Sequence, residues 1–435
     1  MLRIPQRLHN LQMSPMARGV ARIMTGSVAG QGLVILCYPV LTRLYDPAEF
    51  GLLTVFSSVV GMISVVSSVS LFQAIPVPPD DQDAADLAWT ALAIVTFTTV
   101  VTAGVGLVAG EQIGSLLGVP RLADYWWLVA LTVFVMGAYL VLSEWMVRER
   151  SYGALARRNL LMGVGQATTQ VGLGVAGVTP LGLLLGLGVG RACALGGLLS
   201  SGGLLRRARP GPRTMRAALV RFRRFPLLAT PAAFVTSAGL EVPLLVVSAF
   251  YGDARAGLLG LTVRVFSGPA QVIGEAIDQV FSGESSARIR NPDGTVAAMT
   301  RTTVRRLLLI GLAPAVLLAT SGPWLFSVVF GPDWSEAGFY AQLLALPYLL
   351  QFAVNPVSGL LLYLQRQGQS LGWSCMRLVF TGGGPALCAV LGAPVWVAVA
   401  ALAASHVLSY LLLYVLCVRA ARAADAEYRR KGSPA

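Results

Sequence analysis

Charged side chains interrupt several long apolar runs of the sequence, and their chemistry is the least compatible with simple packing. Glu241 lies within the apolar run 226–250, and Arg264 lies within the run that follows it. Arg191 and Arg377 interrupt two further runs. Inside a membrane each such charge costs about 2.5–3.5 kcal/mol on insertion scales, so it usually faces a cavity or a partner. These four side chains are therefore candidates for lining a polar cavity.

Helical spacing gathers more polar residues on the face that carries Arg264. Gln271, Glu275 and Asp278 follow it at offsets of 7, 11 and 14 residues, which places all four within about 40° of one line at about 100° per residue. Amides in other apolar runs complete the predicted cavity: Gln31, Gln166, Gln170 and Asn355. Glu241, Glu275 and Asp278 are also candidates for binding a coupling ion. Because Glu275 and Asp278 lie near the inner end of their run, a solvated interfacial position is the alternative for both.

Glu241 and Arg264 lie at matching depths in neighbouring runs. At 1.5 Å per residue, both are about 12–14 Å from the outer ends of two antiparallel helices. An ion pair is therefore predicted, since pairing would lower the cost of burying both charges. Two interpretations stay open: a structural salt bridge, or a cavity pair that opens when a substrate phosphate or a coupling cation arrives.

The overall composition excludes a soluble enzyme. Of the 435 residues, 55% are hydrophobic and 12% are charged, against roughly 45–50% and about 25% in soluble domains. The single lysine, Lys431, lies in no phosphate-binding loop, and His9 and His406 are too few for a His-rich metal site. The Gly-x-Ser-x-Gly match at 368–372 lies in a short turn between two apolar runs, which does not fit a nucleophile elbow. We therefore expect no enzyme, no catalytic residue, no metal and no cofactor.

Twelve apolar stretches are long enough to cross a bilayer, which takes about 20 residues as a helix. They are 23–42, 50–72, 87–108, 125–146, 159–178, 180–204, 226–250, 256–280, 307–329, 338–363, 371–391 and 394–417. With the N-terminus inside, 27 of the 33 basic residues fall in cytoplasmic segments and three in outer loops. This bias predicts that both termini are cytoplasmic, and it explains the net charge of +13 without a nucleic acid partner. The segment 73–86 is acidic, yet this topology also places it inside.

The chain has a natural middle and an internal repeat. We predict an all-α polytopic membrane protein divided into a cytoplasmic segment (1–22), an N-lobe (23–205), a basic cytoplasmic linker (206–225), a C-lobe (226–417) and a basic cytoplasmic tail (418–435). Residues 45–53 shift by 206 positions onto 251–259, with Tyr, Ala, Gly, Leu and Leu coinciding. In each half this segment joins the first span to the second. Two six-helix lobes related by a pseudo-twofold axis along the membrane normal are therefore expected.

The repeat segment of the first half also carries a resemblance to a known family. Residues 38–52 read Tyr-Pro-Val-Leu-Thr-Arg-Leu-Tyr-Asp-Pro-Ala-Glu-Phe-Gly-Leu, and an Ala74-Ile75 pair with a following acidic run comes after the next span. This pattern resembles the Wzx-type oligosaccharide and polysaccharide flippases of the multidrug/oligosaccharidyl-lipid/polysaccharide exporter superfamily. One departure matters, because members often carry Arg-Tyr-Glu where this chain has Ser70, Leu71 and Phe72. Any substrate or coupling role of that triplet cannot be carried over.

The resemblance implies two six-helix lobes that face each other in a V and a site between them. It implies a bacterial inner-membrane flippase that moves an undecaprenyl-pyrophosphate-linked oligosaccharide, or a related polysaccharide precursor, to the outer leaflet by alternating access. Its expected partners are that lipid-linked oligosaccharide, membrane lipid and other polysaccharide-assembly proteins. Two alternatives stay open: a cation-coupled small-molecule antiporter of the multidrug type, and a membrane scaffold of the same fold that transports nothing.

Overall fold

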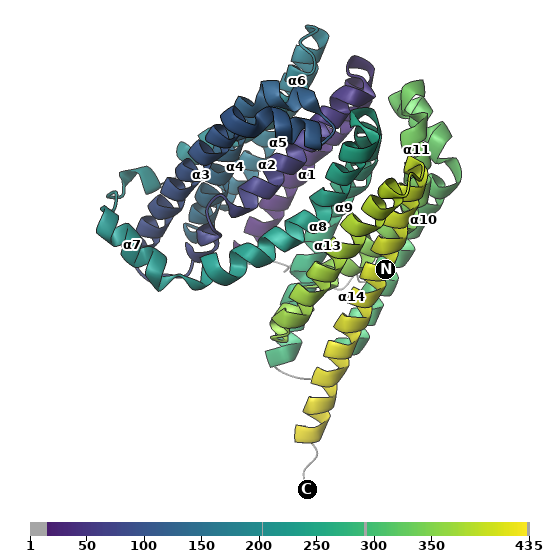
Figure 1. Cartoon of the computed structure of the whole chain (residues 1–435). Helices are drawn as coiled ribbons and strands as arrows, with labels where there is room; N and C mark the ends of the chain where they lie inside the picture. Colours follow the sequence, from purple (N-terminus) through teal and green to yellow (C-terminus); the bar gives the residue numbers. More distant parts are fainter. Residues whose placement is uncertain (1–14, 202, 291–293, 433–435) are drawn as a thin grey trace, which may run out of the picture.

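A computed structural model describes residues 15–201, 203–290 and 294–432, and the regular structure within them is entirely helical (Figure 1). The predicted cytoplasmic segment 1–22 lies outside the described residues up to position 14, and the predicted tail does so at its last three positions. The all-α class is confirmed.

Within the described residues, six long helices form an N-terminal bundle, and the helices after residue 229 form a C-terminal bundle (Figure 1). The N-terminal helices are α1 (Pro15–Leu44), α2 (Pro47–Val66), α3 (Asp81–Leu116), α4 (Trp126–Arg148), α5 (Tyr152–Val175) and α6 (Leu181–Leu199). The C-terminal helices are α8 (Thr230–Tyr251), α9 (Asp253–Arg290), α10 (Val296–Phe330), α11 (Ser335–Val354), α12 (Leu360–Tyr363), α13 (Gln367–Val390) and α14 (Val395–Gly432). Helix α7 (Pro212–Arg221) lies between the two bundles in the sequence.

Ten helical stretches among the described residues are long and apolar enough to cross a membrane. Two of the twelve predicted spans, 159–178 and 371–391, do not meet that measure, and they correspond to α5 and α13. Both helices are 24 residues long, but α5 contains Arg158 and three amides, and α13 contains two glutamines and Arg377. Their polar residues therefore lower the hydropathy, while their length is sufficient.

Two predicted spans are interrupted, and backbone conformation explains both interruptions. The predicted span 50–72 ends at Val66, because Val69 and Ser70 adopt positive φ angles of 44° and 56° before a 3-10 turn begins at Leu71. A positive φ is uncommon in residues other than glycine, and it breaks the helical hydrogen-bond ladder. The predicted span 338–363 is divided by a 3-10 turn, Asn355–Val357, whose Pro356 cannot donate a main-chain hydrogen bond.

Small residues allow the N-terminal helices to approach closely. A Cβ atom built on Gly186 would lie 2.2 Å from Cγ of Gln170, and one on Gly190 would lie 2.8 Å from Cβ of Gln166. Side chains at these glycines would therefore push α5 and α6 apart. Gly182, Gly186 and Gly190 recur every four residues, and this spacing is typical of closely packed membrane helices.

Candidate functional site: the interface between the two bundles

The bundles meet at one end of the molecule and diverge toward the end that carries α7 and the C-terminus (Figure 1). Helix α2 packs against both α8 and α9. The indole N–H of Trp334 donates to the carbonyl of Thr42 at 3.1 Å, and the hydroxyl of Ser248 donates to the carbonyl of Leu117 at 2.7 Å. These contacts join residues that are 292 and 131 positions apart in sequence. They close this end of the interface, which we call the sealed end.

The start of α2 shows why the motif in residues 45–51 has its residue types. The Asp46 side chain caps α2 by accepting from the main-chain N–H of Glu49 at 2.8 Å, and the Glu49 carboxylate accepts from the N–H of Asp46 at 3.0 Å. Pro47 occupies the first turn, where its missing N–H would have had no helical partner. This capping box fixes the point at which the chain enters α2.

The two copies of the internal repeat lie against each other at the sealed end. A Cβ atom on Gly51 would lie 1.9 Å from the carbonyl oxygen of Asp253, and one on Gly257 would lie 1.8 Å from the carbonyl oxygen of Pro47. Both residues of the first contact correspond to residues of the second after a shift of 206 positions. The contact is thus reciprocal, and only glycine permits this approach of backbone to backbone.

The predicted ion pair between Glu241 and Arg264 is wrong. Among the described residues, the ion pairs do not include these two, because hydroxyl groups of α2 bind each charge separately. Arg264 donates to Thr54 at 3.0 Å and to Ser57 at 2.9 Å, and Ser58 donates to Glu241 at 2.7 Å. Residues 54, 57 and 58 share one face of α2 at i, i+3 and i+4. We call these three residues the hydroxyl face of α2.

A large polar cavity lies beyond the hydroxyl face of α2, toward the diverging end. It has a volume of about 690 Å³ and is formed by α8, α9, α11 and the turn that follows α11. Four predicted site residues line it: Gln271, Glu275, Asp278 and Asn355. The amide of Gln271 donates to Glu275 at 3.1 Å. Gln271, Glu275 and Asp278 of the predicted polar face of α9 thus line this cavity, whereas Arg264 of the same face does not.

A second compartment of about 200 Å³ connects this cavity to the N-terminal bundle, because Gln271 and Glu275 line both. Its other wall contains the predicted Gln31 of α1 and also Arg158 of α5. The Arg158 guanidinium lies 4.9 Å from the centre of the Tyr139 ring and donates to the Asn159 side chain at 3.0 Å. Together the two compartments place one arginine opposite two carboxylates across the interface.

The remaining predicted residues take part in helix packing within one bundle. Gln170 is 1% exposed and donates to the carbonyl of Leu183 at 3.0 Å, and Gln166 lies against the glycine face of α6. Arg377 is 3% exposed, donates to the carbonyl of Thr236 at 2.7 Å and lies 4.8 Å from the Trp373 ring.

Arg191 donates to the sulfur of Met136 at 2.7 Å and to the carbonyl of Leu187 at 3.3 Å. It lines none of the cavities described here. The structure therefore gives Arg191, like Arg377, neighbours within its own bundle and no place on the wall of the interface.

Sequence reasoning missed Arg158 as a cavity residue. It follows Arg148, Arg150 and Arg157 directly before the predicted span 159–178, and such a basic cluster is typical of a cytoplasmic segment. The available signal was its neighbour Asn159, which begins a polar helical face. Tyr348 and Tyr363 were missed as well, and they line the larger cavity.

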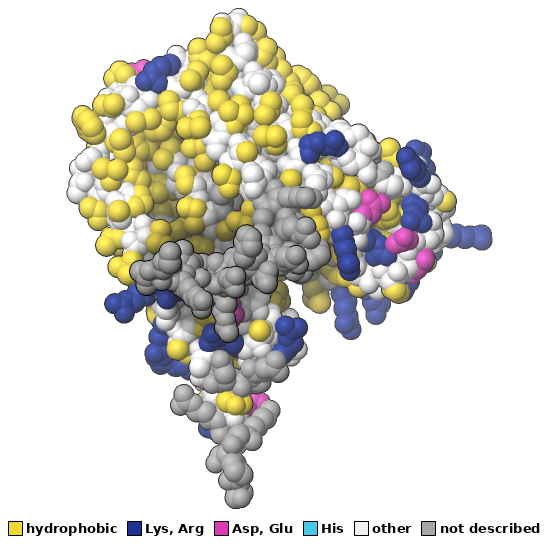
Figure 2. Space-filling view, turned by 180° about the vertical axis from the view of Figure 1, so that it is seen from behind, with side chains coloured by type: hydrophobic (Ala, Val, Ile, Leu, Met, Phe, Trp, Pro, Cys, Tyr) yellow, Lys and Arg dark blue, Asp and Glu magenta, His cyan; other side chains and the backbone are white. Residues whose placement is uncertain are grey.

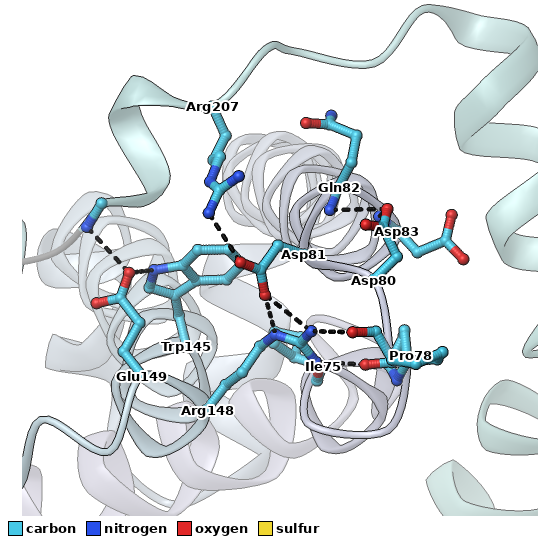
Figure 3. Close-up of polar contacts among 12 residues, drawn as sticks. Ile75, Pro78, Asp80, Asp81, Gln82, Asp83, Trp145, Arg148, Glu149 and Arg207 are labelled. Atoms are coloured by element: carbon cyan, nitrogen blue, oxygen red, sulfur yellow. Dashed lines mark hydrogen bonds and ion pairs between the residues drawn. The ribbon is translucent and has the colours of Figure 1, made fainter.

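The acidic segment 80–86 binds the basic connection between the bundles (Figure 3). Asp81 pairs with Arg148 at 3.0 Å and with Arg207 at 2.9 Å, and Asp83 pairs with Arg221 of α7 at 2.6 Å. The predicted linker 206–225 is thus partly a helix, and it is fastened to the start of α3. Basic side chains gather toward the right and lower edges in Figure 2, away from a broad hydrophobic area.

Comparisons with known proteins agree on one fold. A family model described as polysaccharide biosynthesis protein matches residues 40–339. The succinoglycan biosynthesis transport protein ExoT of Rhizobium meliloti (strain 1021) is 26% identical over 372 residues, which are 83% of this chain and 72% of that protein.

Among solved structures, the lipid II flippase MurJ in an inward closed conformation aligns with a TM-score of 0.72 at 10% identity, covering 92% of this chain and 87% of that one. A multidrug resistance transporter of the MATE family, in an inward-facing conformation, aligns with a TM-score of 0.69 at 14% identity, covering 96% and 100%. At these identities the structures establish the shared fold.

Proposed function

Because the chain belongs to the polysaccharide biosynthesis protein family, we propose that it is a flippase for a lipid-linked oligosaccharide. It is a multi-pass membrane transporter of polysaccharide biosynthesis and not an enzyme. The substrate under this proposal is an undecaprenyl-pyrophosphate-linked oligosaccharide or a related precursor. The observation that carries the proposal is the polar compartment between the bundles, which adjoins the larger polar cavity of the C-terminal bundle. Reciprocal glycine contacts close the opposite end of the interface.

The chemistry of the cavity fits the head group of such a substrate. The carboxylates of α9 can accept hydrogen bonds from sugar hydroxyls, and the amides of α9 and α11 can donate to these hydroxyls and accept from them. Across the interface, Arg158 can form charge-assisted hydrogen bonds with a phosphate. Movement of the two bundles about the site would expose it alternately to the two sides of the membrane.

We further propose twelve spans, which are the ten apolar stretches together with α5 and α13, and a pseudo-twofold axis between the lobes. Both termini then lie in the cytoplasm of a bacterium, and the protein resides in the inner membrane. The orientation rests on the bias of basic residues. A reporter that is active only in the periplasm should be silent when fused after Ala435, and strong activity would contradict this topology.

The function is tested by reconstitution. Vesicles containing the purified chain should move a fluorescent undecaprenyl-pyrophosphate-linked sugar between leaflets, measured by its accessibility to a membrane-impermeant quencher. Arg158→Ala should slow this movement tenfold or more, because a hydrogen bond to a charged group is worth about 1.5–3 kcal/mol. The matched control is Arg157→Ala, since Arg157 is exposed and bonds Ser200 and Ser201 instead.

A cation-coupled small-molecule antiporter is the second candidate, and the carboxylates of Glu275 and Asp278 favour it. The same vesicles distinguish the two. Gradient-driven movement of a small cationic dye, without movement of the lipid-linked sugar, would support the antiporter. Movement of neither probe would support a scaffold that transports nothing.

A further inference from the structure

An apolar groove within the C-terminal bundle adjoins the polar cavity. It has a volume of about 190 Å³ and lies between α9 and α10, with α11 as its floor. Its walls include Phe266 and Ile273 of α9 and Ile310 and Ala315 of α10. An engineered cavity of about 150 Å³ with apolar walls stays dry and binds benzene. The groove is therefore large enough for a hydrocarbon segment.

The groove opens on the outer surface of the bundle. Helix α10 packs along α11 but makes few contacts with α9. Ile273 and Ile310, on opposite walls, are 44% and 61% exposed. Both helices are among the apolar stretches long enough to cross a membrane, so the exposed apolar side chains on the rim of the groove can contact lipid tails.

The groove is also continuous with the polar cavity. Ala270, Tyr348 and Phe352 line both. The ring of Tyr348 stacks on Phe266 inside the groove, with centroids 4.6 Å apart and planes within 2°. Polarity changes abruptly there, from apolar side chains on one side to Gln271, Glu275 and Asn355 on the other. A molecule that spans this boundary must itself be amphiphilic.

We propose that the groove between α9 and α10 binds the hydrocarbon tail of the lipid-linked substrate while the head group occupies the polar cavity. This inference rests on the proposed function. Because membrane lipid is as apolar as the groove, the affinity of the groove for the tail comes from van der Waals packing rather than from removal of water. The groove thereby sets where the tail leaves the protein, and it orients the pyrophosphate relative to the cavity.

The experiment measures equilibrium binding to the detergent-purified full chain. The probes are one pyrophosphate-linked N-acetylglucosamine on an undecaprenyl tail and the same head group on a two-isoprene tail. Ala315→Trp fills the groove. We expect it to weaken binding of the long-tailed probe about tenfold, since even one methylene in an apolar pocket is worth that much. Binding of the short-tailed probe should change less than twofold.

The matched control is Val316→Trp, because Val316 is 50% exposed on the same helix and does not line the groove. It should change neither affinity. A second groove variant, Ile310→Ala, adds no bulk and tests the groove even if Ala315→Trp fails to fold. It should weaken only the long-tailed probe.

The outcomes separate the two proposals. If the wild-type chain binds neither probe, the proposed function fails. If it binds both and the groove variants bind the long-tailed probe as the wild type does, only the groove proposal fails. If the groove variants weakened binding of both probes equally, the groove proposal would also fail. It would fail too if a phosphatidylglycerol with ordinary acyl chains displaced the long-tailed probe as well as the unlabelled substrate does, because the groove would then be a site for bulk lipid.

Discussion

The two ends of the interface between the bundles differ in chemistry. At the sealed end, backbone meets backbone at Gly51 and Gly257, and capping and hydroxyl groups satisfy the neighbouring polar atoms. At the open end, amides, carboxylates and Arg158 line a cavity of about 690 Å³ and its neighbour. A seal must exclude water, which close packing of small residues achieves. A binding cavity must keep polar groups accessible, which prevents such packing.

Between the sealed end and the open end of the interface, the hydroxyl face of α2 lies against α9 and forms a middle layer. Gly257, Arg264 and Gln271 follow one another at seven-residue intervals, or about 10 Å of helix each. The middle layer holds Arg264 and Glu241 against the hydroxyl face of α2. These two charges of the C-terminal bundle are thus bound by neutral groups of the opposite bundle, so separating the bundles would expose both at once.

The largest effect is expected at the seal itself. Gly51→Ala places a Cβ where the Asp253 carbonyl lies, and such overpacking typically costs about 1–3 kcal/mol. Because only the closed interface contains this clash, the bundles should separate at this end. A cysteine introduced at Leu258, which is 5% exposed, should then react faster with a membrane-impermeant maleimide in a background lacking the native cysteines. Export should fall at least fivefold.

The control for the seal is Gly32→Ala, since a Cβ there meets nothing within 4 Å. Both its labelling and its export should match the wild type. If Gly51→Ala behaved like Gly32→Ala, the close approach of the repeat segments would not be what keeps this end closed.

The next effect concerns the middle layer. Arg264→Ala should lower export more than abundance, and Arg264→Lys should restore it only partly, because one ammonium cannot reproduce two hydrogen bonds from a planar fork. Double-mutant cycles on melting temperature refine this prediction. Coupling of Arg264 with Ser57 should exceed coupling of Arg264 with Glu241, because only the first pair is in direct contact. The reverse order would restore the ion pair that the structure excludes.

The smallest effect is expected at the basic connection near the open end. Asp81→Asn removes both exposed ion pairs to Arg148 and Arg207, which are worth about 0–1 kcal/mol each. Trypsin should cleave α7 faster in inside-out vesicles at low salt, with the difference lost at high salt, where surface charges are screened. Glu111→Gln, at the exposed far end of α3, is the control. A salt-independent difference would argue against an electrostatic attachment.

The sequence predicted the helical class and the polar face of α9 because both depend on local periodicity. Gln271, Glu275 and Asp278 face the cavity, as their spacing indicates. Sequence reasoning also named Gln170 and Arg377 as cavity candidates, but both are buried within single bundles. Periodicity shows that a face is polar without showing what lies opposite. A main-chain carbonyl of a neighbouring helix in the same bundle accepts from each of these side chains, Leu183 from Gln170 and Thr236 from Arg377.

The internal repeat illustrates the same division between sequence and tertiary structure. The shift of 206 residues is visible in the sequence, and so are the capping residues Asp46, Pro47 and Glu49, because a helix start is a local structure. That the two copies contact each other is decided only when the bundles pack, since Gly51 meets Asp253 and Gly257 meets Pro47 across more than 200 residues. The same packing brings α2 between Glu241 and Arg264, whose matching depths had predicted a direct pair. Depth follows from counting residues along a helix, whereas neighbours depend on which helix lies alongside.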